Sequence, residues 1–325
     1  MLATLRQYSG TIAGGLAIGA AAGFGGSLLA DKNKAVSPPI TKIEKFPLER
    51  LDKYDAPKQP PAPPPTPPVK RLERWFKRWY DDSGDMSTLG WHLTKPHPVL
   101  QKHYNAWMNT KNDEDQRLIL FPLCGASVDL AYLARRGHQV IGVDGVPKAL
   151  DALLADYGEE VPSGGGLKPG EMRLRVAQPD WKQMKAAEFI STKERKYTPA
   201  PFLMAVQGDF LDFNAAAAAK YGFPEFDCAF DRGGIVAVEP SDRPQYAANL
   251  ASLVKSGGRL LLVTVEHDPT FGPPHNVDEK EVRKLFGKDF EVEMLSREDK
   301  MEAEPHWKKR GATRFDEVAY MCRRR

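Results

Sequence analysis

The sequence predicts an α/β domain built around a mostly parallel β-sheet with an antiparallel edge. Three observations predict this fold. Residues Arg117–Asp144 have the pattern of a strand, a glycine turn, a helix and a second strand. Short apolar segments then alternate with helical patterns as far as Phe286. The last two apolar segments have the short alternating pattern of antiparallel edge strands.

The first strand, turn and helix are the clearest part of this pattern. Leu118–Leu123 is a short apolar run that suits a strand buried on both faces. Gly125 follows in a tight turn, where the absence of a Cβ lets a ligand approach the backbone. Residues 128–134 then have an apolar face at helical spacing, and Gly137 ends the helix.

The second strand, Val140–Val143, leaves Asp144 at its carboxyl end. A carboxylate in this place can accept hydrogen bonds from both hydroxyls of a ribose. The turn at Gly125 lacks the GxGxxG pattern that cradles a pyrophosphate, which favours a nucleoside cofactor without phosphate, such as S-adenosylmethionine. The alternative is a simple turn followed by a solvated aspartate.

Two later strands end in polar residues that belong at the same sheet edge. Phe202–Val206 precedes Gly208 and Asp209, where the carboxylate could bind the exocyclic amine of a purine or could merely cap a turn. Phe226–Phe230 precedes Arg232. This arginine could bind a carboxylate of the cofactor or the substrate, or pair with the neighbouring Asp231.

The remaining elements complete the alternation. A helix is predicted over Gln245–Lys255, a strongly apolar strand over Arg259–Val265 and a helix over Asp278–Phe286. Phe290–Leu295 and Glu317–Cys322 are the two predicted edge strands. Residues 158–202, rich in glycine, proline and lysine, are predicted to form an insertion at the edge of the sheet.

Composition limits the classes of function. The 325 residues carry a formal charge of +3 with 27% charged residues, which does not indicate a nucleic-acid partner. Three scattered cysteines are too few for a disulfide framework or a zinc site. The sequence also contains no pattern that predicts a metal site.

The N-terminal residues predict targeting or membrane attachment. Thr11–Ala30 is an uncharged run, close to the roughly 20 residues that span a bilayer as a helix. Gly15, Gly19 and Gly23 have the spacing of a helix-packing face, which indicates a membrane-protein partner. We expect residues 1–30 to anchor the protein in the inner mitochondrial membrane. The alternative is a soluble protein from which this segment has been removed.

A proline-rich linker, residues 31–70, separates this segment from a globular domain at 71–325. Its proline run favours an extended spacer. The domain then begins with three tryptophans, Trp75, Trp79 and Trp91. We expect these aromatic side chains to form a lid on the core. His92, which follows Trp91, is the histidine of this region most worth attention.

Three stretches together resemble the thiopurine S-methyltransferase family. They are FPLCGASVDLAYLARRGHQVIGVD, FDCAFDRGGIVAVEPSDRPQYA and GPPHNVDEKEVRKLFG, and the resemblance extends from about Arg71 to the C-terminus. It implies a seven-stranded, Rossmann-like methyltransferase sheet and the cofactor S-adenosylmethionine. Ala126 and Gly145 stand where the family usually has a lysine and a small polar residue.

The resemblance also implies roles for particular residues. Those at the cofactor would be Trp75, Leu123, Gly125, Asp144, Gly208, Asp209 and Arg232. Those at the substrate would be Trp79, Trp91 and Arg232, with Trp91 standing where the family has a phenylalanine that covers the site.

The expected reaction is methyl transfer to a small-molecule thiol or a similar soft nucleophile. Such an in-line displacement needs alignment and the exclusion of water, so no catalytic side chain is predicted. The alternative is a non-catalytic subunit that uses the same fold as a docking module in a mitochondrial membrane complex. A nicotinamide-dependent oxidoreductase is disfavoured by the single-glycine turn.

Overall fold

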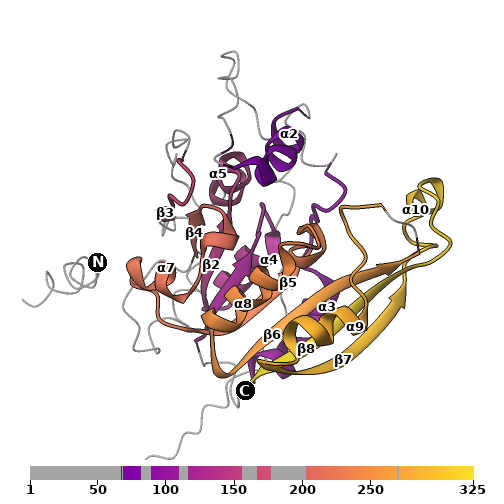
Figure 1. The fold of residues 1–325 in the computed structure, drawn as a ribbon. Helices are drawn as coiled ribbons and strands as arrows, with labels where there is room; N and C mark the ends of the chain where they lie inside the picture. Colours follow the sequence, from indigo (N-terminus) through magenta and orange to yellow (C-terminus); the bar gives the residue numbers. More distant parts are fainter. Residues whose placement is uncertain are drawn as a thin grey trace, which may run out of the picture. The chain divides into compact units, whose positions relative to one another are not determined.

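Figure 1 shows the protein as a computed structural model. The structure describes residues 67, 69–81, 89–109, 116–155, 167–176, 203–268 and 271–325. The stretch Thr11–Ala30, its three spaced glycines and nearly all of the proline-rich linker lie outside these residues. The same is true of much of the predicted insertion at 158–202.

The predicted membrane location is corrected by the structure. Across the described part of the chain, no helix combines the length and the apolar character needed to cross a bilayer. This finding overturns the prediction of a protein anchored in the mitochondrial membrane. The predicted membrane-protein partner has no support either.

The centre of the fold is an eight-stranded sheet with the order β3-β4-β2-β1-β5-β6-β8-β7 (Figure 1). Its strands are β1 (Leu118–Pro122), β2 (Gln139–Asp144), β3 (Arg173–Val176), β4 (Leu203–Gln207), β5 (Phe226–Arg232), β6 (Val254–His267), β7 (Phe290–Asp299) and β8 (Phe315–Arg324). The five strands from β4 to β6 run parallel. Both edges are antiparallel, because β3 pairs with β4 and β8 pairs with β6 and β7.

The sheet has eight strands rather than the predicted seven, because the predicted insertion contributes β3. This strand pairs with β4 from Arg173 opposite Gln207 to Val176 opposite Met204. Its residue Arg175 is buried, and its guanidinium lies 2.5 Å from the carboxylate of Asp151. A four-residue strand with an arginine facing inward has no run of apolar residues, which is why the sequence pattern missed it.

Helices cover the two faces of the sheet and form two separate cores. The helices are α2 (Glu73–Asp81), α3 (Pro98–Met108), α4 (Val128–Arg135), α5 (Pro147–Ala155), α7 (Ala215–Lys220), α8 (Arg243–Leu253), α9 (Glu279–Phe286) and α10 (His306–Lys309), with short 3₁₀ turns η2 (Lys70–Leu72), η4 (Phe210–Asp212) and η5 (Ile235–Ala237). Side chains of α2 to α5 pack on one face, and those of α7 to α9 on the other. The alternation of apolar residues along each central strand supplies both cores.

Most predicted elements are present, with shifted ends. The predicted helix over Gln245–Lys255 ends at Leu253, and β6 starts at Val254, five residues before the predicted strand. Val254 already pairs with Phe226 of β5, and an irregularity in that ladder separates it from the regular pairs that begin at Arg259. Cross-strand pairing, which local sequence does not encode, sets this boundary.

Leu72, just before α2, packs against Gly145, just after β2. Gly145 follows β2, and a Cβ at this position would lie 2.7 Å from Cδ1 of Leu72. Leu72 is buried in the same core as Trp79 of α2. Gly145, which stands where the family usually has a small polar residue, therefore leaves room for the Leu72 side chain. Leu72 in turn packs in the same core as Trp79 of the expected lid.

We expect Gly145→Ala to destabilise the fold by about 1 to 3 kcal/mol, because the added methyl group overpacks against Leu72. Urea denaturation of this variant, of Leu72→Ala and of the double variant forms a double-mutant cycle. The double variant should lose less stability than the sum of the two single variants. Additive losses would show that the two residues do not interact in this way.

Candidate active site

A cavity of about 670 Å³ lies at the carboxyl ends of β1, β2, β5 and β6. Seven of the nine residues expected at the site line it: Trp75, Trp79, Trp91, Leu123, Gly125, Asp144 and Arg232. Gly208 is not among its lining residues, and Asp209 lines an adjoining cavity of about 290 Å³. The two cavities share Leu72, Trp75, Leu123 and Ala237.

The turn after β1 holds Asp144 in place. The backbone N–H of Gly125 donates to one carboxylate oxygen at 2.8 Å, and that of Val146 donates to the other at 2.8 Å. The backbone at Leu123 and Gly125 adopts positive φ, of 45° and 54°. Burial raises the pKa of Asp144 to about 6, although backbone hydrogen bonds from Val146, Gly125 and Gly145 oppose the rise. A carboxylate has about four lone-pair sites, so a further hydroxyl donor can be accepted.

Three tryptophans cover this turn. The rings of Trp75 and Trp91 meet edge to face, with centroids 5.6 Å apart, and the guanidinium of Arg78 lies 5.3 Å from the centre of the Trp91 ring. Trp79 is 6% exposed and reaches to 3.6 Å from the position of a Cβ on Gly125. Trp79 therefore lies against the Gly125 turn, and Trp75 and Trp91 line the same cavity.

Arg232 faces the cavity and is not hydrogen-bonded to the neighbouring aspartate. Its Nη1 donates to the carbonyl oxygen of Trp91 at 2.5 Å, and burial lowers its pKa. Asp231 instead accepts hydrogen bonds from the Tyr246 hydroxyl at 2.9 Å and from the backbone N–H of Gly234 at 2.9 Å. The expected pairing with Asp231 is thus absent between these two residues, and Arg232 lines the cavity.

The opposite wall contains polar residues that the sequence patterns missed. Glu317 of β8 lies 3.2 Å from Nε2 of the buried His97 and 3.4 Å from Nζ of Lys300. Burial acts to raise the pKa of Glu317, but the contacts with His97 and Lys300 outweigh it and the pKa is lowered. His97 also accepts a hydrogen bond from Val99 N–H at the start of α3. Glu317 and Lys300 are far from the recognised motifs in sequence, so no local pattern marks them.

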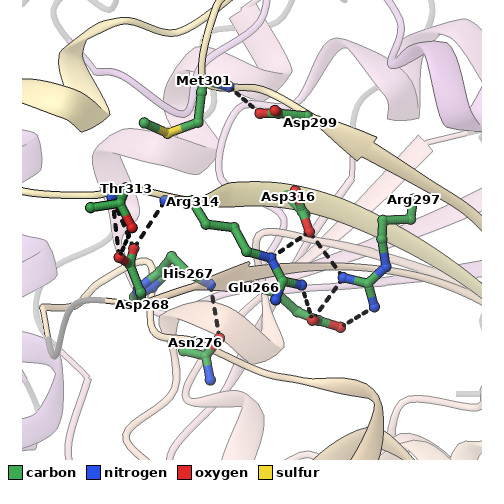
Figure 2. Close-up of polar contacts among 10 residues, drawn as sticks. All are labelled: Glu266, His267, Asp268, Asn276, Arg297, Asp299, Met301, Thr313, Arg314 and Asp316. Carbon is green, nitrogen blue, oxygen red and sulfur yellow. Dashed lines mark hydrogen bonds and ion pairs between the residues drawn. The ribbon is translucent and has the colours of Figure 1, made fainter.

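Ion pairs at the base of this wall hold three strands together. Figure 2 shows Glu266 of β6 bound by both terminal nitrogens of Arg297 at 2.8 Å, while Arg314 bridges Glu266 and Asp316. Nearby, Asp268 accepts hydrogen bonds from the backbone of Thr313 and Arg314. The segment between β7 and β8 is therefore fastened to β6 beside the cavity.

Aromatic side chains stack on one another around α10. His267 stacks on Phe271 with ring centroids 4.4 Å apart, and Trp307 stacks on Phe315 at 4.1 Å. Trp307 also donates from Nε1 to Glu304 at 2.7 Å. Trp307 and Phe315 line the cavity, so this end of it has an aromatic wall next to charged side chains.

Asp209 already has a protein partner. Its carboxylate lies 2.5 Å from Nε of Arg71, the residue before Leu72, and accepts the backbone N–H of Leu211 at 2.9 Å. The predicted turn-capping role is thus present, since Asp209 precedes η4. The ion pair therefore connects Arg71, just before α2, to the end of β4, where the sequence predicted a purine site.

Removing the ion pair between Arg71 and Asp209 should destabilise the fold. We expect Arg71→Leu to lower the free energy of unfolding by about 1 to 2 kcal/mol, because it leaves Asp209, which is 7% exposed, without its charged partner. The loss is smaller than for a fully buried pair because Arg71 is 37% exposed and its charge is screened by solvent. Arg74→Leu is the matched control, because Arg74 and Glu239 are both about half exposed and 3.5 Å apart. The control should cost less than about 0.5 kcal/mol in urea denaturation. Equal losses would contradict the special role of Arg71.

A metal centre is not part of this geometry. Over the ranges that the structure describes, no group of three or more His, Cys, Asp or Glu side chains could hold a metal ion. The cavity instead combines a fixed carboxylate, a backbone turn and aromatic covers. Fold and site together define a Rossmann-like protein with a site for a nucleoside cofactor.

Comparison with known proteins identifies the family. The family model described as thiopurine S-methyltransferase matches residues 70–325, and the chain belongs to this family. The enzyme named thiopurine S-methyltransferase from Pseudomonas fluorescens is 32% identical over 257 residues, which cover 77% of this chain and 98% of the relative. The enzyme of that name from Azotobacter vinelandii is 31% identical and covers the same shares. That from Oryctolagus cuniculus is 27% identical, over 71% of this chain and 81% of the relative.

The membership establishes the general chemistry. The protein is an S-adenosylmethionine-dependent methyltransferase, as the resemblance implied. The cofactor supplies an activated methyl group. The comparisons give no support to a non-catalytic docking subunit.

Proposed function

We propose that the protein transfers the methyl group of S-adenosylmethionine to the sulfur of a small-molecule thiol. The observation that carries this proposal is the continuity of one cavity from Asp144 and the Gly125 turn to Arg232 and the aromatic wall. A cofactor and an acceptor can then lie in the same enclosed space. The S-methyltransferase names of the relatives support a sulfur acceptor.

The cofactor would lie across the ends of β2 and β1. In this arrangement, Asp144 accepts hydrogen bonds from the ribose hydroxyls, and the positive-φ backbone at Leu123 and Gly125 allows close approach. Trp75 covers the cofactor. Both oxygens of Asp144 are already oriented by backbone amides, so binding requires little rearrangement of this side chain.

The purine would extend towards Gly208 and Asp209 at the end of β4. The Arg71 guanidinium lies on Asp209, so the purine amine would share that carboxylate with the arginine. The adjoining cavity, which Asp209 and Trp75 both line, has room beside this ion pair. Gly208 donates its N–H to the carbonyl of Asp144 at 2.9 Å, which links the purine and ribose positions through the backbone.

The acceptor would lie between Arg232 and the aromatic wall, under Trp79 and Trp91. Arg232 is held on the Trp91 carbonyl and can direct its remaining N–H groups at an anionic sulfur. Alignment of the two reactants in such a site contributes up to roughly 7 to 11 kcal/mol in well-oriented systems. Exclusion of water by the tryptophans further favours the attack of a thiolate on a sulfonium.

The role of Asp144 predicts that cofactor affinity depends on pH. Its folded-state pKa of about 6 lies above the ordinary 3.8, so the carboxyl takes up a proton as the pH falls through 6. Calorimetric titration should show affinity for S-adenosylmethionine constant above pH 7 and falling by up to about tenfold for each pH unit below 6. The charged acceptor of the ribose hydroxyls is lost over this range.

Asp144→Asn should bind the cofactor about 10- to 150-fold more weakly at pH 7.5, from the loss of roughly 1.5 to 3 kcal/mol. Its affinity should vary much less with pH. Asp289→Asn, beside the start of β7, is the control and should match the unaltered protein. A folded Asp144→Asn variant with unchanged affinity would remove Asp144 from the cofactor site.

Thiol methylation itself is tested with radiolabelled cofactor and a panel of small thiols. We expect turnover by the unaltered protein and a loss of about 10- to 100-fold in kcat/KM for Arg232→Met, because a charge-assisted contact to sulfur is removed. Cofactor binding by the variant, measured separately, shows whether its site is intact. If the unaltered protein binds the cofactor but methylates oxygen or nitrogen acceptors in place of thiols, the proposed substrate class is wrong.

A further inference from the structure

His92 occupies a fixed position on the wall of the cavity. Its backbone N–H donates to the carbonyl of Leu89 at 2.8 Å, which closes a turn. The preceding carbonyl, that of Trp91, accepts the 2.5 Å hydrogen bond from Arg232. The residue is therefore held between the lid and the arginine at the end of β5.

The imidazole of His92 is available to a ligand. Among the residues that the structure describes, neither ring nitrogen has a hydrogen-bond or ion-pair partner. Burial and the positive charge of Arg232 both lower the pKa of His92, so the ring is neutral near pH 7 and has a lone pair that can accept a proton.

Two carboxylates on the wall of the same cavity, those of Asp129 and Glu317, already have protein partners. Asp129 accepts hydrogen bonds from the backbone N–H of His97 at 2.7 Å and from the Ser127 hydroxyl at 2.9 Å. Glu317 is paired with His97 and Lys300. The contacts of Glu317 lower its pKa, so this carboxylate is a weak proton acceptor.

The proposed reaction needs a proton acceptor. A thiol has an ordinary pKa of about 8.5, whereas the thiolate is the effective nucleophile. Transfer of a methyl group to a neutral thiol also releases one proton. A neutral base beside the sulfur would remove this proton as the new bond forms.

We propose that His92 accepts the proton of the acceptor thiol during methyl transfer, an inference that rests on the proposed thiol substrate. The S–H bond breaks and its proton moves to a ring nitrogen of His92. The sulfur electron pair forms the bond to the methyl carbon, and the electrons of the old carbon–sulfur bond remain on the departing cofactor sulfur. The neighbouring charge of Arg232 stabilises the thiolate and favours release of the proton from His92 to solvent.

The acidity of the acceptor tests this role. The experiment compares the unaltered protein and His92→Asn with two probes at pH 7: 2-mercaptoethanol, which is mostly protonated, and the 5-thio-2-nitrobenzoate ion, which is already a thiolate. We expect kcat for 2-mercaptoethanol to fall by about 10²-fold in the variant, the lower end of the usual contribution of a general base. The rate with the preformed thiolate should change by less than about threefold, because it has no proton to lose.

His103→Asn is the matched control, since His103 lies on α3 and is not among the residues that line the cavity. It should leave both rates unchanged. Equal losses with the two probes in His92→Asn would overturn the proposal and indicate that His92 only shapes the cavity. Unchanged rates with both would overturn it as well. If the unaltered protein binds the cofactor but methylates neither thiol, the proposed function fails, and the inference about His92 fails with it.

Discussion

The end of the cavity where we propose that the cofactor binds depends on one carboxylate, that of Asp144. Its two oxygens receive the backbone N–H groups of Gly125 and Val146, so a single side chain joins the turn after β1 to the start of α5. The positive φ at Gly125 directs its amide towards this carboxylate. Because the Asp144 carboxylate is buried, these hydrogen bonds also stabilise its charged form.

The rest of the site is assembled around this anchor by segments from both ends of the domain. Leu72 and Arg71 seat the N-terminal lid on Gly145 and Asp209, and Trp79 rests on the cofactor turn. At the other end, the antiparallel strands β7 and β8 supply the wall. Their ion pairs to Glu266 hold that wall rigid, which matters for a reaction that depends on alignment.

Two glycines next to the cavity are explained by the side chains that pack against them. Gly145 replaces a small polar residue because Leu72 uses the space that a side chain would fill. Met172, which precedes the short strand β3, packs against Gly208, where a Cβ would lie 2.6 Å from the methionine Cγ. The region expected to bind the purine is therefore shaped by a segment outside the family motifs.

The sequence by itself determined the parallel sheet, the turn at Gly125 and the placement of Asp144 and Arg232 at strand ends, because these follow from short-range periodicity and from the geometry of parallel strands. It missed β3, since the absence of an apolar run over four residues does not specify what a segment pairs with. Only the tertiary structure decided that Arg71 holds Asp209 and that Glu317 and His92 share one cavity. These contacts join residues more than a hundred positions apart, and their energies come from burial and charge pairing that exist only after the chain has folded.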